Sequence, residues 1–319
     1  MERWQILLYL GALAVGAAVG LAFPSAAHGF ELAINPVLIV LLYATFLAVP
    51  FPEIGKALKD ARFLGAVLVL NFVLVPVVVW VLSRFVAGEQ ALLVGVFLVL
   101  LTPCIDYVIV FSRLAGGASS RLLAAAPLLM LLQLALLPVY LLVFVGPELV
   151  EIIDVAPFID AFLVLIVLPL TLAILTQLLA RRFALARAVE RAMETAMVPV
   201  MMLTLAVVVA SQIEAVRSEF GLLVAVIPLY VAFLIVMPFI GWGTARLFRQ
   251  DVPSARALIF SGATRNSLVV LPLALALPES LALAAVVVVT QTLVELVGMV
   301  VYVRAIPLLV RGRGATVTA

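Results

Sequence analysis

Apolar stretches of about twenty residues recur along the whole chain, and they decide what it can fold into. A helix needs roughly 20 apolar residues to cross a bilayer. Hydrophobic residues make up 67% of the sequence and charged residues 11%, whereas soluble domains carry about 45–50% and about 25%. No segment between the stretches is long enough for a folded domain outside the membrane. The sequence therefore predicts an all-α, multi-pass membrane protein, and it excludes a soluble enzyme and a nucleic-acid-binding module.

Ten transmembrane helices are predicted, with proline and glycine in the gaps between them. They are expected over residues 4–23, 34–52, 63–84, 90–112, 120–145, 158–180, 194–212, 222–246, 254–277 and 282–303. With the amino terminus inside, the inner loops and tails hold sixteen lysines and arginines, and the outer loops hold only Arg84 and Arg217. Because positive residues are retained on the cytoplasmic side, both termini are predicted to be cytoplasmic.

The spans fall into two halves. Five lie within residues 1–156 and five within 157–319, and an odd number per half gives the second half the opposite orientation in the membrane. We expect one transporter domain, 1–319, made of an inverted repeat of 1–156 and 157–319. Spans 3–5 and 8–10 are expected to form a moving core, and spans 1, 2, 6 and 7 a panel.

Two spans are predicted to be broken. The fourth is interrupted at 101–106 and the ninth at 261–267, at corresponding positions of the two halves. Pro103 removes a backbone donor and clashes with the preceding turn, and Gly262 and Thr264 loosen the ninth span. A lone proline equally suits a simple kink, but paired interruptions in two repeats indicate a binding site at the bilayer midplane.

Three charged residues fall inside the predicted spans: Asp106, Arg265 and Glu295. Each is unfavourable at the bilayer centre by at least about 2.5–3.5 kcal/mol. Asp106 and Arg265 lie in the two interrupted segments, where they would form a structural ion pair or act as a proton acceptor and a fixed cation. Glu295 has no basic neighbour in the sequence, so it is a candidate proton carrier; a static hydrogen bond is the alternative.

Two further polar residues are candidates for the same core. Cys104 directly follows Pro103; a lone cysteine is most often a small buried hydrophobe, but a thiolate is the ligand that a soft metalloid prefers. Asn71 in the third span faces the core or bonds a neighbouring helix. With one cysteine and one histidine in the chain, neither an internal disulfide nor a Cys/His metal cluster is expected, and no cofactor motif is present.

The whole chain resembles the bile-acid/sodium symporter superfamily, and within it the arsenite efflux permeases. Three segments carry the resemblance. Leu-Thr-Pro-Cys-Ile at 101–105 is similar to the fourth-helix segment whose cysteine is essential for arsenite transport; 70–72 is similar to the third-helix asparagine motif, and 293–295 to the tenth-helix glutamate motif. The resemblance implies ten helices in inverted five-helix repeats, with helices 4 and 9 broken and crossed.

The chain also departs from both groups. The permeases carry a second ninth-helix glutamate where this chain has Leu268, and a small residue in place of Asp106. The sodium sites of the bile-acid symporters correspond to Val108, Ile109 and the region of Arg265. Sodium needs hard oxygen ligands, so we predict no sodium coupling, with Arg265 holding the empty site neutral in place of the ion.

The sequence thus predicts a proton-coupled secondary transporter of the plasma membrane that exports arsenite or antimonite. The predicted substrate-binding residues are Cys104, Asn71, Arg265 and Asn266; the predicted proton carriers are Asp106 and Glu295; the predicted broken-helix residues are Pro103, Gly262 and Thr264. The alternative is a transporter of a small organic anion, whose carboxylate Arg265 would bind. The expected partners are the small substrate, protons and the lipid bilayer.

Overall fold

The computed structural model describes residues 2–48, 59–105, 107–146, 160 and 163–311, and every regular element within these ranges is a helix. The α-helices are α1 (Glu2–Ala22), α2 (Ala27–Ala48), α4 (Ala61–Val69), α5 (Val75–Ser83), α6 (Gln90–Leu100), α7 (Tyr107–Leu114), α8 (Ser119–Val145), α11 (Leu168–Ala180), α12 (Ala184–Ser218), α13 (Phe220–Leu247), α14 (Val252–Ala263), α15 (Ser267–Leu275) and α16 (Leu283–Leu309). Single turns of 3₁₀-helix are η1 (Pro24–Ala26), η4 (Arg84–Val86) and η6 (Glu279–Leu281), and π-helical turns are η3 (Leu70–Leu74) and η5 (Leu163–Val167).

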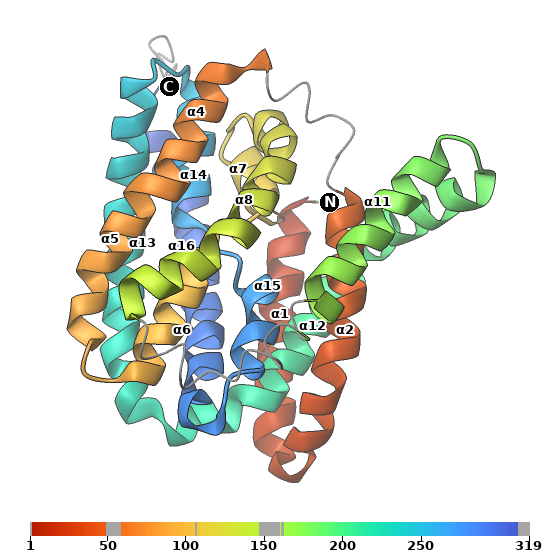
Figure 1. Cartoon of the computed structure of the whole chain (residues 1–319), viewed down its shortest axis with the longest axis vertical. Helices are drawn as coiled ribbons and strands as arrows, with labels where there is room; N and C mark the ends of the chain where they lie inside the picture. Colours follow the sequence, from red (N-terminus) through yellow and green to blue (C-terminus); the bar gives the residue numbers. More distant parts are fainter. Residues whose placement is uncertain (1, 49–58, 106, 147–159, 161–162, 312–319) are drawn as a thin grey trace, which may run out of the picture.

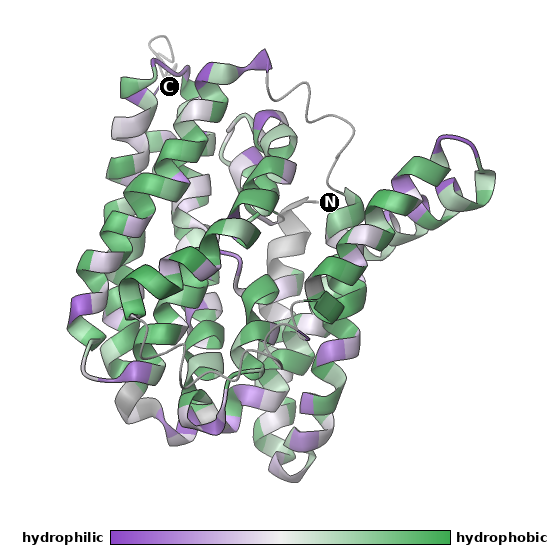
Figure 2. Cartoon of the chain, viewed as in Figure 1, coloured by the Kyte–Doolittle hydropathy of each residue, from purple (hydrophilic) through white to green (hydrophobic). Residues whose placement is uncertain are grey.

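Seven helical stretches of the described chain are long and apolar enough to cross a membrane. They are Pro24–Ala48, Ala61–Val86, Ser119–Val145, Leu163–Ala180, Ala184–Glu214, Leu223–Leu247 and Glu279–Leu309. Large apolar side chains such as Val143 and Phe239 lie exposed on them, and apolar residues cover the helices over most of their length (Figure 2). Because an aqueous surface rarely carries so much apolar area, these faces suit lipid, and the predicted all-α membrane class is confirmed. The other three predicted spans correspond to α1 and to the pairs α6/α7 and α14/α15; the number ten stays a prediction.

The helices pack in two groups (Figure 1). In one group α1, α2, α11 and α12 pack against each other, and in the other α4 to α8 pack with α13 to α16. Within the first group the backbones of α1 and α12 lie in close contact. A Cβ atom at Gly16 would lie 2.5 Å from the Ala206 backbone oxygen, and one at Gly20 would lie 2.5 Å from that of Ala210. Glycines four residues apart allow such backbone contact between membrane helices.

Two helices of the second group are broken at mid-length and meet at their breaks. α6 ends at Leu100 before α7 begins, and α14 ends at Ala263 before α15 begins. The extended segments run antiparallel: the Cys104 N–H donates to the Thr264 carbonyl at 3.1 Å, and the Asn266 N–H to the Thr102 carbonyl at 2.9 Å. The two predicted interruptions are therefore confirmed, although the break in the ninth span covers 264–266 and residues 261–263 are still helical.

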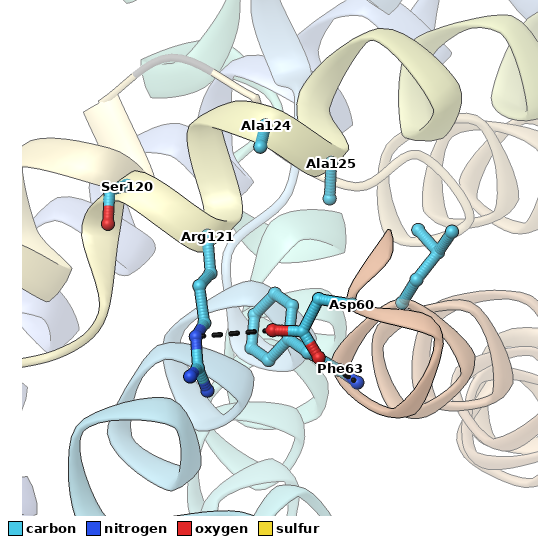
Figure 3. Close-up of a pocket in the computed structure, with 7 residues that line it drawn as sticks. Asp60, Phe63, Ser120, Arg121, Ala124 and Ala125 are labelled. Carbon is cyan, nitrogen blue, oxygen red and sulfur yellow. Dashed lines mark hydrogen bonds and ion pairs between the residues drawn. The ribbon is translucent and has the colours of Figure 1, made fainter. Parts of the chain in front are cut away.

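At one end of the second group Arg121 of α8 joins the starts of two other helices. Its guanidinium lies 3.2 Å from a carboxylate oxygen of Asp60 and 3.4 Å from one of Asp251, the N-cap residues of α4 and α14. Figure 3 shows Arg121 reaching Asp60 beside Phe63, in a cavity of about 200 Å³. The hydrogen bond from the Ser254 side chain lowers the pKa of the Asp251 carboxyl, which keeps it ionised for this contact.

At the same end of the molecule, Arg256 of α14 contacts the C-termini of two further helices. It donates from Nε and Nη2 to the Val310 carbonyl at 3.2 and 3.0 Å, and from Nη1 to the Ala115 carbonyl at 3.0 Å. These carbonyls follow the last residues of α16 and α7. Since helix C-termini carry unpaired carbonyls and partial negative charge, one cation caps both helices and braces them against α14.

We predict that Arg256→Leu lowers the thermal midpoint of the purified protein in detergent, because two helix ends lose their donor. The expected loss is about 1–3 kcal/mol of unfolding free energy, the range for unsatisfied polar groups. Arg304→Leu is the matched control, since Arg304 is exposed on α16 and no contact of its side chain is found among the described residues. Equal midpoints for the two variants would contradict the capping role.

Candidate functional site

Arg265 lies at the centre of the crossing and is fully buried. Its side chain turns back over the end of α14, where Nη2 donates to the carbonyls of Ser261 and Gly262, both at 2.6 Å. Nη1 reaches the Leu100 carbonyl, at the end of α6, at 3.4 Å. The ring of Phe233 lies 5.6 Å from the guanidinium carbon. Each helix C-terminus carries roughly half a negative charge, so one guanidinium balances the two helix ends that it contacts.

Asn71 connects this cation to the third predicted span. Its Oδ1 accepts from Nη2 of Arg265 at 2.9 Å, while Nδ2 donates to the Val67 carbonyl at 3.0 Å and to Ser261 Oγ at 2.9 Å. Asn71 lies in the π-helical turn η3, a local widening of the helix that is frequent at functional sites. Asn71 therefore lies in the same core as Arg265.

Gly262 lies in the last turn of α14 and allows η3 to approach. A Cβ atom there would lie 2.9 Å from Cδ2 of Leu70, which is closer than real Cβ contacts. The sequence interpretation made Gly262 a loosening residue of the break, but in the structure it is helical and its small size is what matters. Pro103 and Thr264 lie within the two extended segments, and the Thr264 hydroxyl donates to the Phe260 carbonyl at 2.6 Å.

Glu295 of α16 contacts both broken helices and is 1% exposed. Its Oε2 accepts from the backbone N–H of Arg265 at 2.8 Å and from Nε2 of Gln291 at 2.5 Å. Its Oε1 accepts from the Tyr107 hydroxyl at 2.6 Å. Glu295 thus meets Arg265 at its backbone, while the guanidinium points toward the ends of α6 and α14.

Tyr107, the first residue of α7, was missed by the sequence interpretation. Its hydroxyl lies within hydrogen-bonding distance of two acceptors, Glu295 Oε1 at 2.6 Å and the Arg265 carbonyl at 2.9 Å. In a sequence, a functional tyrosine in an apolar span cannot be told from one that only packs in the core. The one feature that could have indicated a role for Tyr107 is its position directly after the break. Asp106, the other predicted proton carrier, lies outside the described residues.

Three buried polar atoms near the crossing make no hydrogen bond within the described part of the chain: Nε of Arg265, Nδ2 of Asn266 and Oε1 of Gln291. Buried polar groups are nearly always paired, so this set of two donors and one acceptor suits water or a small polar ligand. Asn266 also caps α15 through its Oδ1, at 3.4 Å from the Val269 nitrogen. Cys104 is buried in the extended segment that pairs with Thr264.

The two groups of helices meet beside this region. Among the described residues, a cavity of about 10 Å³ lies between α1 and α12 on one side and α15 and α16 on the other. It is lined by apolar side chains and by Ser267 and Thr292, whose hydroxyls are 2.7 Å apart. That volume is about what one water molecule needs, so this cavity holds no larger solute.

We predict that Asn71→Leu destabilises the protein more than Ser261→Ala. The leucine removes one acceptor of the buried guanidinium and the amide donor to the Ser261 hydroxyl, whereas the alanine removes one neutral hydroxyl. Hydrogen bonds to charged groups contribute about 1.5–3 kcal/mol and neutral ones about 0.5–1.5 kcal/mol. Thermal unfolding in detergent checks the order, and a Ser261→Ala loss equal to or larger than that of Asn71→Leu would contradict it.

Comparison with known proteins agrees with the resemblance at the level of the superfamily. A search of curated proteins finds no match to the chain. The profile of the Sodium Bile acid symporter family matches residues 35–219, more than half of the chain. The match includes Asn71 and Cys104 and ends before Arg265 and Glu295. Its helices of membrane-spanning length and this match make the chain a multi-pass membrane transporter, and it belongs to the Sodium Bile acid symporter family.

Proposed function

We propose that this protein is a proton-coupled transporter that exports arsenite, with antimonite as a second substrate. The proposal is carried by the unpaired atoms of Arg265, Asn266 and Gln291, which lie around a crossing that also holds Cys104. Arsenous acid is neutral near pH 7, and its hydroxyls both donate and accept hydrogen bonds. A thiol is the soft ligand for its arsenic atom, and a single thiol permits release.

The hydrogen-bond network around Glu295 supports this residue as the proton carrier. The Tyr107 hydroxyl has one hydrogen but lies next to two acceptors, Glu295 Oε1 and the Arg265 carbonyl. When Oε1 carries a proton it can donate to Tyr107, which then donates to the carbonyl, and each of the three oxygens has a partner. When Glu295 is ionised the hydroxyl must leave one acceptor unmatched. Proton uptake and release would therefore switch the Tyr107 hydroxyl of α7 between two acceptors, the Glu295 carboxylate of α16 and the Arg265 carbonyl of the ninth span.

The contacts of Arg265 support transport without sodium. Carbonyls of Leu100, Ser261 and Gly262 and the amide oxygen of Asn71 converge on the guanidinium, and such oxygens are ligands that a hard cation would take. A tethered cation that already occupies them leaves no place for an ion.

We further propose that the second group of helices is the moving core and the first the panel, as two inverted repeats would provide. The contact of α1 and α12 with α15 and α16 would open on one side of the membrane at a time. The positive-inside bias supports cytoplasmic termini in the plasma membrane.

In everted vesicles with an imposed proton gradient, we expect arsenite accumulation that Cys104→Ser and Glu295→Gln each reduce at least about tenfold. The two variants should differ in binding: arsenite raises the thermal midpoint of Glu295→Gln protein in detergent, as it does for the native protein, but not that of Cys104→Ser. Accumulation without a gradient would contradict proton coupling, and absence of accumulation by folded native protein would contradict arsenite export.

A small organic anion is the second candidate, because the Nε donor of a buried guanidinium has no partner within the described residues. Under this alternative, carboxylates accumulate in the same vesicles and arsenite does not. Arg265→Ala then abolishes carboxylate binding, whereas a neutral metalloid does not require the guanidinium.

Replacing sodium by choline is predicted to leave transport by the native protein unchanged. In Arg265→Ala the four oxygens lose their cation, so we expect its thermal midpoint in detergent to be higher in sodium than in choline, with no such difference for the native protein. Asn71→Leu/Arg265→Ala, which removes one of the four oxygens, is the matched control and should show a smaller sodium effect. A sodium-dependent rate in the native protein would contradict the tethered-cation proposal.

A further inference from the structure

A basic pocket lies where α13 ends, α14 begins and α16 ends, away from the crossing. Its volume is about 360 Å³, which is in the range of small-ligand sites. Its polar lining consists chiefly of Arg246, Arg311, Gln250 and Trp242. In Figure 1 the end of α16 lies at the same end of the molecule as the start of α4, which is the end predicted to face the cytoplasm.

The charge of this pocket has no acidic partner among the residues that the structure describes. Neither aspartate nor glutamate is among its described lining residues. The nearest carboxylate in sequence, Asp251, is engaged elsewhere, by Arg121 at 3.4 Å and by the Ser254 N–H at 3.2 Å. Arg246 and Arg311 are both exposed, and the only contact of the Arg246 guanidinium within the described chain is with the Trp242 ring, 3.9 Å from its centroid. Two cations therefore face an open site that has no carboxylate among the described residues.

The surroundings of the pocket suit a lipid. Trp242 is a residue type that gathers at the membrane–water boundary, and its ring holds the Arg246 guanidinium in place by a cation–π contact. Leu308 lines the pocket and is 63% exposed, and Leu247, next to Arg246, is 76% exposed. The site thus has a cationic part for a headgroup and, beside it, apolar side chains for acyl chains.

We propose that this pocket binds the phosphate of an anionic phospholipid from the predicted cytoplasmic leaflet. Arg246 and Arg311 pair with the phosphate oxygens, the pairing for which a guanidinium is best shaped. Gln250 lies within reach of the polar headgroup, and Leu247 and Leu308 contact the chains. Basic pockets between membrane helices on this side are suited to such headgroups, and the site is independent of the substrate that the crossing carries.

The binding is tested with Trp242 as the reporter. The chain has three tryptophans, so Trp4→Phe/Trp80→Phe leaves Trp242 alone. This protein is reconstituted in phosphatidylcholine vesicles, and fluorescence is quenched with dibrominated phosphatidylglycerol or dibrominated phosphatidylcholine. We expect quenching of Trp242 to show at least about a five-fold preference for phosphatidylglycerol over phosphatidylcholine. Arg246→Gln and Arg311→Gln should each lower this ratio about five-fold, or to one where the native ratio is five. Arg246→Lys keeps the charge and retains a preference.

The matched control is the other reporter, Trp4→Phe/Trp242→Phe. Its remaining Trp80 also has an arginine, Arg84, 4.8 Å from its ring centroid, but lies near the far end of α5 and outside the pocket, so no preference is expected. Equal quenching of Trp242 by the two lipids would overturn the proposal. Displacement of the preference by millimolar inorganic phosphate would also overturn it, since the site would then take free phosphate rather than lipid.

Discussion

A backbone that leaves the helical conformation inside a bilayer must find every hydrogen-bond partner within the protein, and the centre of this molecule depends on that constraint. The two extended segments satisfy part of it by pairing with each other. Arg265 satisfies much of the rest, because its side chain covers the carbonyl ends of α6 and α14, its N–H is bound by Glu295 and its carbonyl lies next to Tyr107. The hydrogen bonds that hold the two breaks are therefore concentrated on one residue.

This concentration links the proposed proton carrier to the position of the helices. Glu295 lies on α16, which is continuous through the crossing, while its partners Tyr107 and Arg265 belong to the two broken helices. A change in the charge of one carboxyl group alters hydrogen bonds to both. The contacts of Arg121 and Arg256 join the ends of other helices of the same group.

The sequence was sufficient for the membrane class, for most helix boundaries to within a few residues and for both breaks, because these follow from hydrophobic length and from the Pro103 and Gly262 segments. It placed two helix starts wrongly: α2 begins at Ala27 rather than 34, and α12 at Ala184 rather than 194, within the predicted loop 181–191. It did not predict which way the Arg265 side chain points or that Glu295 meets a backbone N–H, since both depend on the antiparallel register of segments about 160 residues apart. Gly262 shows a related limit: the small residue was visible, but its reason, the approach of Leu70, is a tertiary contact.

A guanidinium that is part of the chain differs from a bound ion in its availability. An ion drawn from solution has a local concentration set by the environment and must be caught and surrendered in each cycle. A side chain is present at a fixed, very high effective concentration from the moment the chain folds. The balance of charge at the ends of α6 and α14 is then set by the polypeptide itself and does not depend on the sodium concentration around the cell.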